Sequence, residues 1–149
     1  MAEQKFQTNL LRNVHTNAQL LNLIDGGNRK GYQSSVAKYR DLIIWMVCID
    51  GKEKGGFKNE YAPGTNENII IETVVDGKTS FNGEPITHRS LSPDKIVFEK
   101  KNVAGIQLFY LKGIYRYIKE KSNPCGARYY FKVGEAKIKE TGGIDIIYY

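Results

Sequence analysis

Basic and aromatic side chains are interleaved through the second half of this sequence, and together they have the chemistry of a nucleic-acid-binding surface. Residues 95–140 contain eleven Lys or Arg against four acidic residues, a net charge of +7, whereas the whole chain of 149 residues carries +6. Seven of the ten tyrosines lie from residue 110 onward. Lys and Arg neutralise backbone phosphates and aromatic rings stack on bases, so the pattern predicts a nucleic-acid partner. The alternative, that these lysines are the solvated face of Tyr-rich strands, stays open at this point.

The cations expected to contact phosphate are spread over the strands of this region and one earlier loop: Arg29, Lys30, Lys100, Lys101, Lys112, Arg116, Arg128, Lys132 and Lys137. Tyr115, Tyr117 and Tyr130 are the candidates for stacking on bases. Alternation is clearest over residues 128–133, where Arg128, Tyr130 and Lys132 would share one face and leave the other to the core. The sequence therefore predicts one basic aromatic face on the sheet.

A glycine-rich basic loop, GGNRKG at residues 26–31, could wrap a phosphate through its backbone amides, with Arg29 and Lys30 adding charge. No Gly-Lys-Ser or Gly-Lys-Thr follows it, and it comes after an expected helix, so it is neither a Walker motif nor a dinucleotide fingerprint. A helix C-cap followed by a plain loop is the other interpretation.

Catalytic groups are sparse. Asp94, Glu135 and Lys137 could form the two-carboxylate and lysine set of a Mg²⁺-dependent nuclease, although Glu-x-Lys recurs by chance in a Lys-rich chain. His15 and His88 have no Cys or His partner at a ligand spacing, so neither a metal site nor a cofactor is expected. We therefore expect a chain that is not an enzyme.

The elements that must position these residues are one helix and many short strands. Apolar residues recur at three- and four-residue steps from Phe6 to Ile24, which predicts a five-turn helix within residues 1–25. Residues 26–149 then form a β-rich body, with strands expected at 42–48, 68–75, 95–99, 106–111, 113–118, 128–133 and 144–149. This order predicts a single α+β domain over 1–149, with a mainly antiparallel sheet that is curled or barrel-like.

Composition limits location and assembly. The sequence contains no run of eighteen apolar residues, so no membrane span is predicted. The polar start of the chain is unlike a secretory signal, and we therefore expect a cytoplasmic protein. Cys48 and Cys125 should remain thiols there. The apolar end of the chain, residues 144–149, could pair within the sheet or with a second copy, which leaves monomer and homodimer open.

A succession of short motifs resembles the SET- and RING-associated-like domains of the wider PUA-like superfamily, as found in modification-dependent HNH restriction systems. The motifs are GGNRKG at 26–31, DLIIWM at 41–46, GGFKNEY at 55–61, DGK at 76–78, NGEPI at 82–86, IVFEK at 96–100 and LFYLKGIY at 108–115. The resemblance implies a curved barrel that binds duplex DNA and flips a modified cytosine into a pocket. It implies pocket roles for Tyr61, Asp76 and Asn82. Asp76 precedes its glycine, Gly83 follows Asn82, and the family's Gly-Glu-Gly is absent, so the pattern departs from the family at the pocket.

The leading prediction is a non-catalytic module that binds nucleic acid, DNA rather than RNA, and reads a modified or flipped base. One alternative is a small phage or mobile-element protein that binds and inhibits a protein partner such as a nuclease. The other is the Mg²⁺-dependent nuclease built on Asp94, Glu135 and Lys137.

Overall fold

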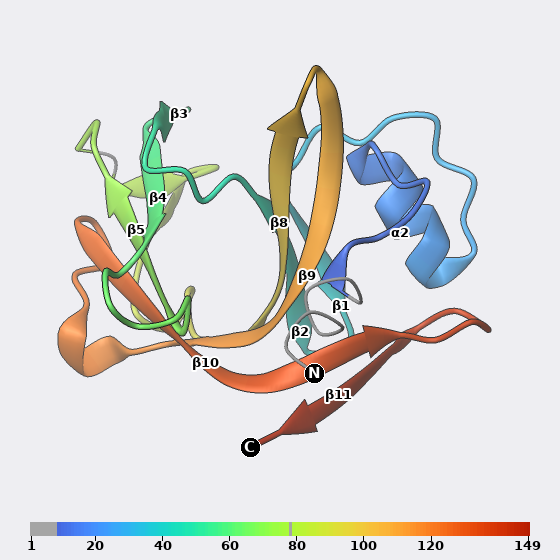
Figure 1. The fold of residues 1–149 in the computed structure, drawn as a ribbon. Coiled ribbons are helices and arrows are strands. Elements are labelled where there is room, and N and C mark those ends of the chain that lie inside the picture. The colour runs from blue at the N-terminus through green and yellow to red at the C-terminus, as the bar shows by residue number, and fades with distance from the viewer. Residues whose placement is uncertain (1–8, 78) are drawn as a thin grey trace.

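Nine strands form one sheet that curls into a half-barrel, and helix α2 packs on its outer side (Figure 1). The computed structural model describes residues 9–77 and 79–149. The elements of the large sheet are β1 (Val36–Tyr39), β2 (Leu42–Val47), β3 (Glu53–Lys54), β4 (Phe57–Tyr61), β5 (Ile69–Val74), β8 (Lys95–Val103), β9 (Ile106–Tyr117), β10 (Ala127–Ile138) and β11 (Ile144–Tyr148). The remaining elements are α2 (Asn17–Asp25), a small hairpin of β6 (Ser80–Phe81) and β7 (Glu84–Pro85), and the 3-10 turn η1 (Lys119–Lys121).

The strand order is β1-β2-β8-β9-β10-β5-β4-β3, and β11 pairs with the second half of β10. The pairings are antiparallel except that of β2 with β8, which is parallel. Because the sheet curls, β2 and β4, which stand near its two ends, both line the concave side (Figure 1). The predicted α+β order and the mainly antiparallel, strongly curled sheet are therefore confirmed.

The curl follows from irregularities in the two longest strands. The pairing of β8 with β9 shifts register between Val97 and Phe98. The pairing of β10 with β9 shifts register between Lys132 and Gly134. Gly113 in β9 has φ 124, a conformation open to glycine and strained for other residues. Bulges of this kind bend a strand and increase its twist. They also explain why the two strands expected at 106–111 and 113–118 are one continuous strand, since Gly113 bends β9 without ending it.

The sheet buries apolar side chains on both of its faces. On the outer face, α2 contributes Leu20, Leu21 and Ile24 to a core that includes Phe98 and Phe109. The concave face holds a second core that includes Trp45, Val97 and three tyrosines: Tyr115, Tyr117 and Tyr130. Much of the central part of the sheet is therefore buried on both faces.

The predicted five-turn helix is wrong in length. Helix α2 begins after Thr16, whose hydroxyl caps it by accepting from the Gln19 amide at 3.1 Å, and ends at the left-handed Gly26. Before it, Asn13 has φ 61, and Leu10 forms a β-bridge with Tyr110, so this segment pairs with β9 instead of turning as a helix. The part of the prediction on residues 1–8 lies outside the described residues. Within residues 9–77 and 79–149, no helix is long and apolar enough to cross a membrane.

Candidate nucleic-acid interface

The concave side of the half-barrel contains a set of buried polar and charged side chains. In the described part of the chain the buried polar residues are Asn59, Glu72, Lys95, Glu99 and Arg128. All of them lie on strands of the large sheet. Burying a charged group is unfavourable unless it has a partner, so a cluster of this kind calls for a specific role.

Three of these residues lie in a row across neighbouring strands. Asn59 on β4 and Arg128 on β10 both stand opposite Glu72 on β5. The Arg128 guanidinium donates from Nη1 to Glu72 Oε1 at 2.8 Å, and from Nε to the Pro124 carbonyl at 2.7 Å. Two polar atoms of this row, Asn59 Oδ1 and Arg128 Nη2, are buried without a hydrogen-bond partner. Such atoms are costly to bury.

A cleft of about 220 Å³ opens where β2 faces β4. We call it the inner cleft. Trp45 and Phe57 supply aromatic walls, while Asn59 and Glu72 supply a polar edge. Phe57 is held in place by the Arg128 guanidinium, which lies 5.4 Å from the centre of its ring. The cleft also includes three lysines, namely Lys52, Lys54 and Lys100.

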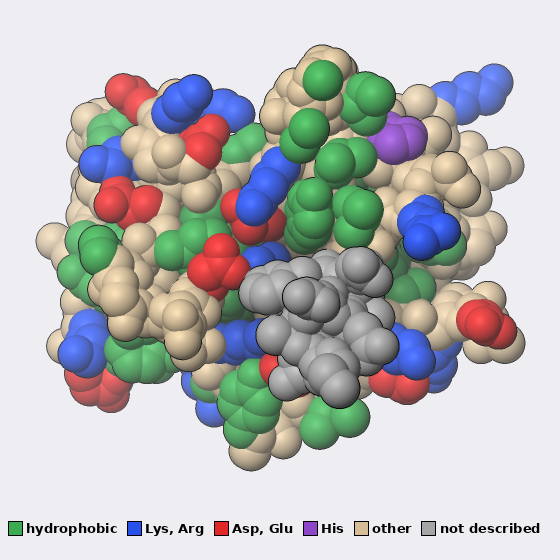
Figure 2. Space-filling view, in the orientation of Figure 1, with side chains coloured by type: hydrophobic (Ala, Val, Ile, Leu, Met, Phe, Trp, Pro, Cys, Tyr) green, Lys and Arg blue, Asp and Glu red, His purple; other side chains and the backbone are tan. Residues whose placement is uncertain are grey.

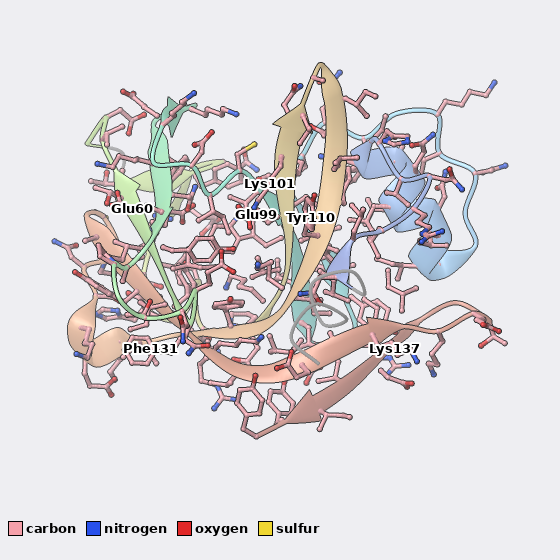
Figure 3. All side chains as sticks on the ribbon, in the orientation of Figure 1. Glu60, Glu99, Lys101, Tyr110, Phe131 and Lys137 are labelled. Atoms are coloured by element: carbon pink, nitrogen blue, oxygen red, sulfur yellow. The ribbon has the colours of Figure 1, made fainter. Side chains whose placement is uncertain are left out.

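A larger groove of about 710 Å³ adjoins the inner cleft and shares Cys48, Lys52, Lys54 and Lys100 with it. We call it the outer groove. Side chains of β8 line it, among them Glu99 and Lys101 (Figure 3). In the space-filling view, basic and acidic side chains lie together near the middle of the visible face (Figure 2).

Ion pairs and hydrogen bonds cross the outer groove. The Tyr61 hydroxyl donates to Glu99 at 2.8 Å, and Lys112 contacts Glu67 at 2.7 Å and Glu99 at 3.9 Å. Tyr115 donates to the Glu67 carbonyl at 2.7 Å, which ties the β4–β5 loop to β9. Burial raises the pKa of Glu99, while the Tyr61 hydroxyl and nearby lysines oppose that rise. Burial and the neighbouring Glu99 raise the pKa of Tyr61, so its hydroxyl remains a donor.

The cations predicted to contact phosphate are divided between several environments. Lys100 and Lys101 line the outer groove, and Lys101 lies 5.2 Å from the Tyr110 ring centre. Lys30 and Lys137 are exposed. The other members have acidic partners: Arg29 with Asp25, Lys112 with Glu67, Arg116 with Asp94, Arg128 with Glu72 and Lys132 with Glu135.

The expected basic aromatic face at 128–133 is not at the surface. Arg128 is 4% exposed and Tyr130 1% exposed, because both point into the concave core. Tyr115 and Tyr117, 1% and 7% exposed, are packed there as well. None of the three tyrosines lines the inner cleft or the outer groove, so they pack the interior instead.

The residues that the family resemblance placed in a pocket are separated in the structure. Tyr61 lines the outer groove. Asp76 is exposed, and its carboxylate lies against Gly56, where an added Cβ would come within 2.3 Å of it. Asn82, with φ 52, occupies the turn of the β6–β7 hairpin. Of the three, only Tyr61 lines the groove or the cleft described above.

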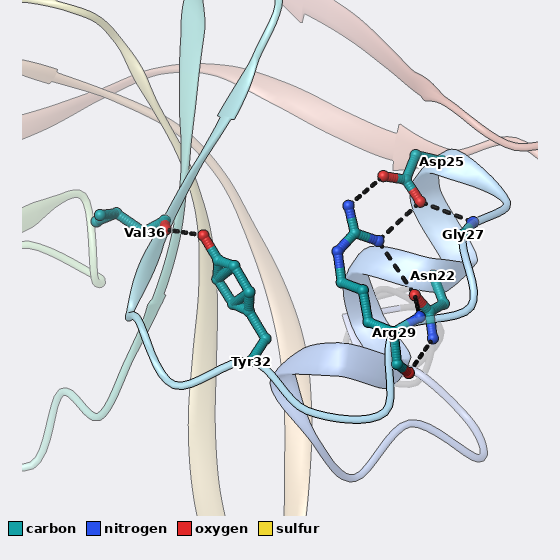
Figure 4. A network of polar contacts seen from close by, with 6 residues as sticks. All are labelled: Asn22, Asp25, Gly27, Arg29, Tyr32 and Val36. Atoms are coloured by element: carbon teal, nitrogen blue, oxygen red, sulfur yellow. Dashed lines mark hydrogen bonds and ion pairs between the residues drawn. The ribbon is translucent and has the colours of Figure 1, made fainter.

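The glycine-rich loop is organised by the helix that precedes it (Figure 4). The Arg29 guanidinium donates to Asp25 at 2.9 Å and to Asn22 at 3.1 Å, and Asn22 also binds the Arg29 backbone. The Arg29 hydrogen bond holds the pKa of Asp25 at about 2. Gly26 closes α2 in the left-handed conformation. These contacts fit the helix C-cap interpretation of the loop, with Arg29 engaged internally.

The carboxylates of the nuclease alternative also have partners. Asp94 receives a two-pronged hydrogen bond from Arg116, at 2.9 Å for each prong, and a third from Tyr148 at 3.1 Å. Glu135 is paired with Lys132 and with the Tyr149 hydroxyl. Over residues 9–77 and 79–149, no group of three or more His, Cys, Asp or Glu could hold a metal ion.

Sequence reasoning missed the residues that form the inner cleft. Trp45 lies in an apolar run that is typical of a core strand, and Phe57, Asn59 and Glu72 had no role in the prediction. A signal was present at 57–61, where Phe57, Asn59 and Tyr61 alternate with Lys58 and Glu60. In β5, Glu72 lies between the buried Ile70 and Val74 at the inward-facing register, where a charge is unusual.

Comparisons with known proteins show a likeness in fold. No protein-family model matches the chain, and no curated protein does. The structure is similar to the solved structure of the 5-hydroxymethylcytosine-specific restriction enzyme AbaSI, with a TM-score of 0.56 and 21% sequence identity. The match covers 80% of this chain and 37% of that one, so this chain spans well under half the length of that enzyme. At this identity the likeness concerns the fold.

The likeness also corrects one expectation. We expected a chain that is not an enzyme, and a solved structure with a similar fold is that of a restriction enzyme. The expectation of a module without catalytic activity is therefore withdrawn.

Proposed function

We propose that this chain binds duplex DNA and recognises a modified cytosine in its inner cleft, as the specificity-determining part of a restriction activity. The fold likeness to a 5-hydroxymethylcytosine-specific restriction enzyme supports the choice of DNA and of a modified cytosine. The features of the cleft support the choice of site.

The inner cleft has the size and chemistry for a single base. A volume of about 220 Å³ suits one nucleobase rather than an extended ligand. Trp45 and Phe57 offer apolar walls against which a flat ring can stack. Since a base within a duplex cannot reach this cleft, recognition requires that the base leave the stack.

The polar edge of the cleft suits cytosine. Arg128 holds one oxygen of the Glu72 carboxylate, and the other oxygen can accept the amino group of cytosine. The Asn59 amide can donate from Nδ2 to the ring nitrogen of the same edge and accept from the cytosine amino group at its unpaired Oδ1. Thymine presents an acceptor where cytosine presents its amino donor, and would leave Glu72 facing that acceptor.

The entrance to the cleft suits the DNA backbone. Lys52, Lys54 and Lys100 line both the inner cleft and the outer groove, and Lys101 lines the groove beside them. A flipped nucleotide carries its phosphates to the mouth of the cleft, where ammonium groups can neutralise them.

The observation that carries the proposal is the pair of unsatisfied polar atoms, Asn59 Oδ1 and Arg128 Nη2, in the buried row beside the cleft. An unpaired buried polar atom is costly, and in this proposal the entering base supplies the missing partner for Asn59, which lines the cleft.

The test is binding of the full chain, by fluorescence anisotropy at several salt concentrations, to matched duplexes with plain, methylated or hydroxymethylated cytosine and to single strands. We expect tighter binding to a modified duplex. Asn59→Ala should abolish that preference and keep the salt-dependent binding to plain duplex, whereas Asn68→Ala, an exposed amide on the β4–β5 connection, should change neither. Equal binding to all duplexes, or no binding to DNA, would overturn the proposal. The same mixtures with Mg²⁺, followed on a gel, measure whether the chain cleaves modified DNA.

A further inference from the structure

Strand β11 forms a free edge of the large sheet. It pairs with β10 on one side, and no other strand of the described chain pairs with it. In Figure 1, β11 lies at the lower margin of the molecule, below β10. The free edge of a strand presents backbone N–H and C=O groups that can pair with another chain.

The hydrogen bonds between β11 and β10 decide which backbone groups face the free edge. The Lys139 amide donates to the Gly143 carbonyl, and the Tyr149 amide donates to the Val133 carbonyl. Since antiparallel strands alternate between hydrogen-bonded and non-hydrogen-bonded pairs, the odd-numbered residues of β11 bond to β10. The even-numbered residues of β11 therefore direct their backbone groups away from β10.

The outward backbone groups belong to Ile144, Ile146 and Tyr148. The Ile144 amide donates to the Tyr39 hydroxyl at 2.8 Å, as expected for an outward group at the start of the strand. Across residues 9–77 and 79–149, the amides and carbonyls of Ile146 and Tyr148 have no hydrogen-bond partner. The edge thus offers two N–H and two C=O groups to a further antiparallel strand.

The other two edges of the sheet, as far as the structure describes it, are protected against such pairing. Strand β3 has only two residues, Glu53 and Lys54, and both are charged and exposed. Strand β1 contains the exposed Lys38, and its Val36 carbonyl accepts a hydrogen bond from the Tyr32 hydroxyl at 2.7 Å. Short strands, lysines and covered backbone groups are the usual devices against edge pairing. Strand β11 has five residues and contains neither Lys nor Pro.

The side chains along the free edge are apolar and exposed. Ile147 is 70% exposed, Tyr148 46% and Tyr149 76%. Contiguous apolar side chains at a surface mark a site of interaction with another protein. The β11 edge therefore combines unpaired backbone groups with an apolar surface.

The edge is complementary to itself. When two copies of β11 run antiparallel with Ile147 opposite Ile147, Ile146 of each copy stands opposite Tyr148 of the other. All the unpaired amides and carbonyls of these two residues then bond to each other. Ile–Ile and Ile–Tyr are favourable cross-strand pairs, and Asp145 stands opposite Tyr149, so no like charges face each other across the two strands.

We propose that the partner of this edge is a second copy of the chain, in a two-fold symmetric dimer that joins two half-barrels through β11. A two-fold interface requires the same patch to be complementary to itself, which is the property of this edge. The dimer forms without DNA.

The test measures the mass of the full chain without DNA, by analytical ultracentrifugation at increasing protein concentration. The mass should rise from that of one chain to that of two. Ile147→Lys places two ammonium groups opposite each other at the two-fold axis, and should weaken dimerisation by about tenfold or more. Because Ile147 is 70% exposed, this variant should keep the fold, which circular dichroism verifies.

Cysteine cross-linking tests the register. At the two-fold axis, position 147 of each copy forms a non-hydrogen-bonded pair, with Cα atoms about 4.5 Å apart, which is within the range of a disulfide. Ile147→Cys should give a disulfide-linked dimer on a non-reducing gel. Asp145→Cys is the matched control, since this exposed position faces Tyr149 of the other copy and should not cross-link. The native Cys48 and Cys125 are present in both variants.

A wild-type chain that keeps the mass of one chain at every concentration overturns the dimer. A dimer that persists unweakened in I147K, or equal cross-linking of I147C and D145C, places the contact elsewhere and overturns pairing through β11. These measurements use no DNA, so their outcome is independent of the proposed function.

Discussion

The Arg128 guanidinium and the Glu72 carboxylate form an ion pair of 2.8 Å inside the half-barrel, where their side chains are only 5% and 11% exposed. The two residues stand directly opposite each other on β10 and β5. Removing one partner leaves the other charge buried and uncompensated, so a substitution of either residue alone should be strongly destabilising.

Arg128→Met should lower the free energy of unfolding by about 3 to 5 kcal/mol, measured by urea denaturation, because Glu72 would remain charged in the interior. Arg116→Met is the matched control. Its partner is Asp94, but the Arg116 side chain is 50% exposed, so the loss should be about 1 kcal/mol or less. Similar losses in the two variants would mean that the Arg128 pair is effectively solvated.

Lys100 and Lys101 should set much of the salt dependence of DNA binding, since both line the outer groove. The variant K100A/K101A should reduce the slope of log affinity against log salt by roughly two units, about one for each phosphate that is no longer neutralised. Lys137 is exposed on the part of β10 that pairs with β11, and K137A should leave the slope unchanged. An altered slope in K137A would extend the interface along β10.

Lys95 should make the protein more stable as the pH rises above 8. Burial lowers the pKa of Lys95 from 10.5 to about 8, so the folded chain binds fewer protons than the unfolded chain between these values. The free energy of unfolding therefore rises with pH across that window, by on the order of 2 kcal/mol between pH 8 and 9.5.

The measurement compares urea denaturation of the wild type and of Lys95→Met at pH 7, 8, 9 and 9.5. The difference between their unfolding free energies should grow with pH in favour of the wild type. If the unfolding free energies of the two proteins changed with pH in parallel, the Lys95 ammonium would be hydrated in the folded chain. Staying at or below pH 9.5 limits ionisation of Tyr115 and Tyr130 in the unfolded chain, since burial raises their pKa values only in the folded one.

Gly113→Ala should be strongly destabilising. The backbone at Gly113 has φ +124, and an added Cβ would come within 2.7 Å of the Gly134 carbonyl and of the Lys132 side chain. We expect a loss of about 2 kcal/mol or more in thermal or urea unfolding. Gly51→Ala, at φ +74 with open space around it, should lose about 1 kcal/mol from backbone strain alone. Equal losses would mean that β9 and β10 can separate at the bulge.

Local sequence patterns predicted strands well where apolar residues run together, as in β2 and β5. They failed for β4, whose charged Lys58 and Glu60 conceal the alternation of Phe57, Asn59 and Tyr61. Pairing of β2 with β8 depends on residues far apart in the chain, and local patterns carry no information about it. For these reasons the order of elements could be predicted and the meeting of β2 with β4 could not.

The candidate site was harder to predict because a curled sheet buries both faces. Alternation correctly placed Arg128 and Tyr130 together, but it does not reveal which face points inward. Net charge drew attention to Lys100 and Lys101, which line the outer groove, and equally to Arg29 and Lys132, which have acidic partners. Charge counts do not distinguish a cation held by a neighbouring carboxylate from one available to a ligand.

The parallel pairing of β2 with β8 has a consequence for how the protein folds. Strand β2 ends at Val47 and β8 begins at Lys95, so the chain must close a long loop before Trp45 can reach its place opposite Val97. The antiparallel neighbours β4 and β5, and β8 and β9, are close in sequence and can form early. The Trp45 wall of the inner cleft is therefore expected to assemble late in folding, after the Phe57 wall. Hydrogen exchange during refolding should show β2 gaining protection after the β4–β5 hairpin.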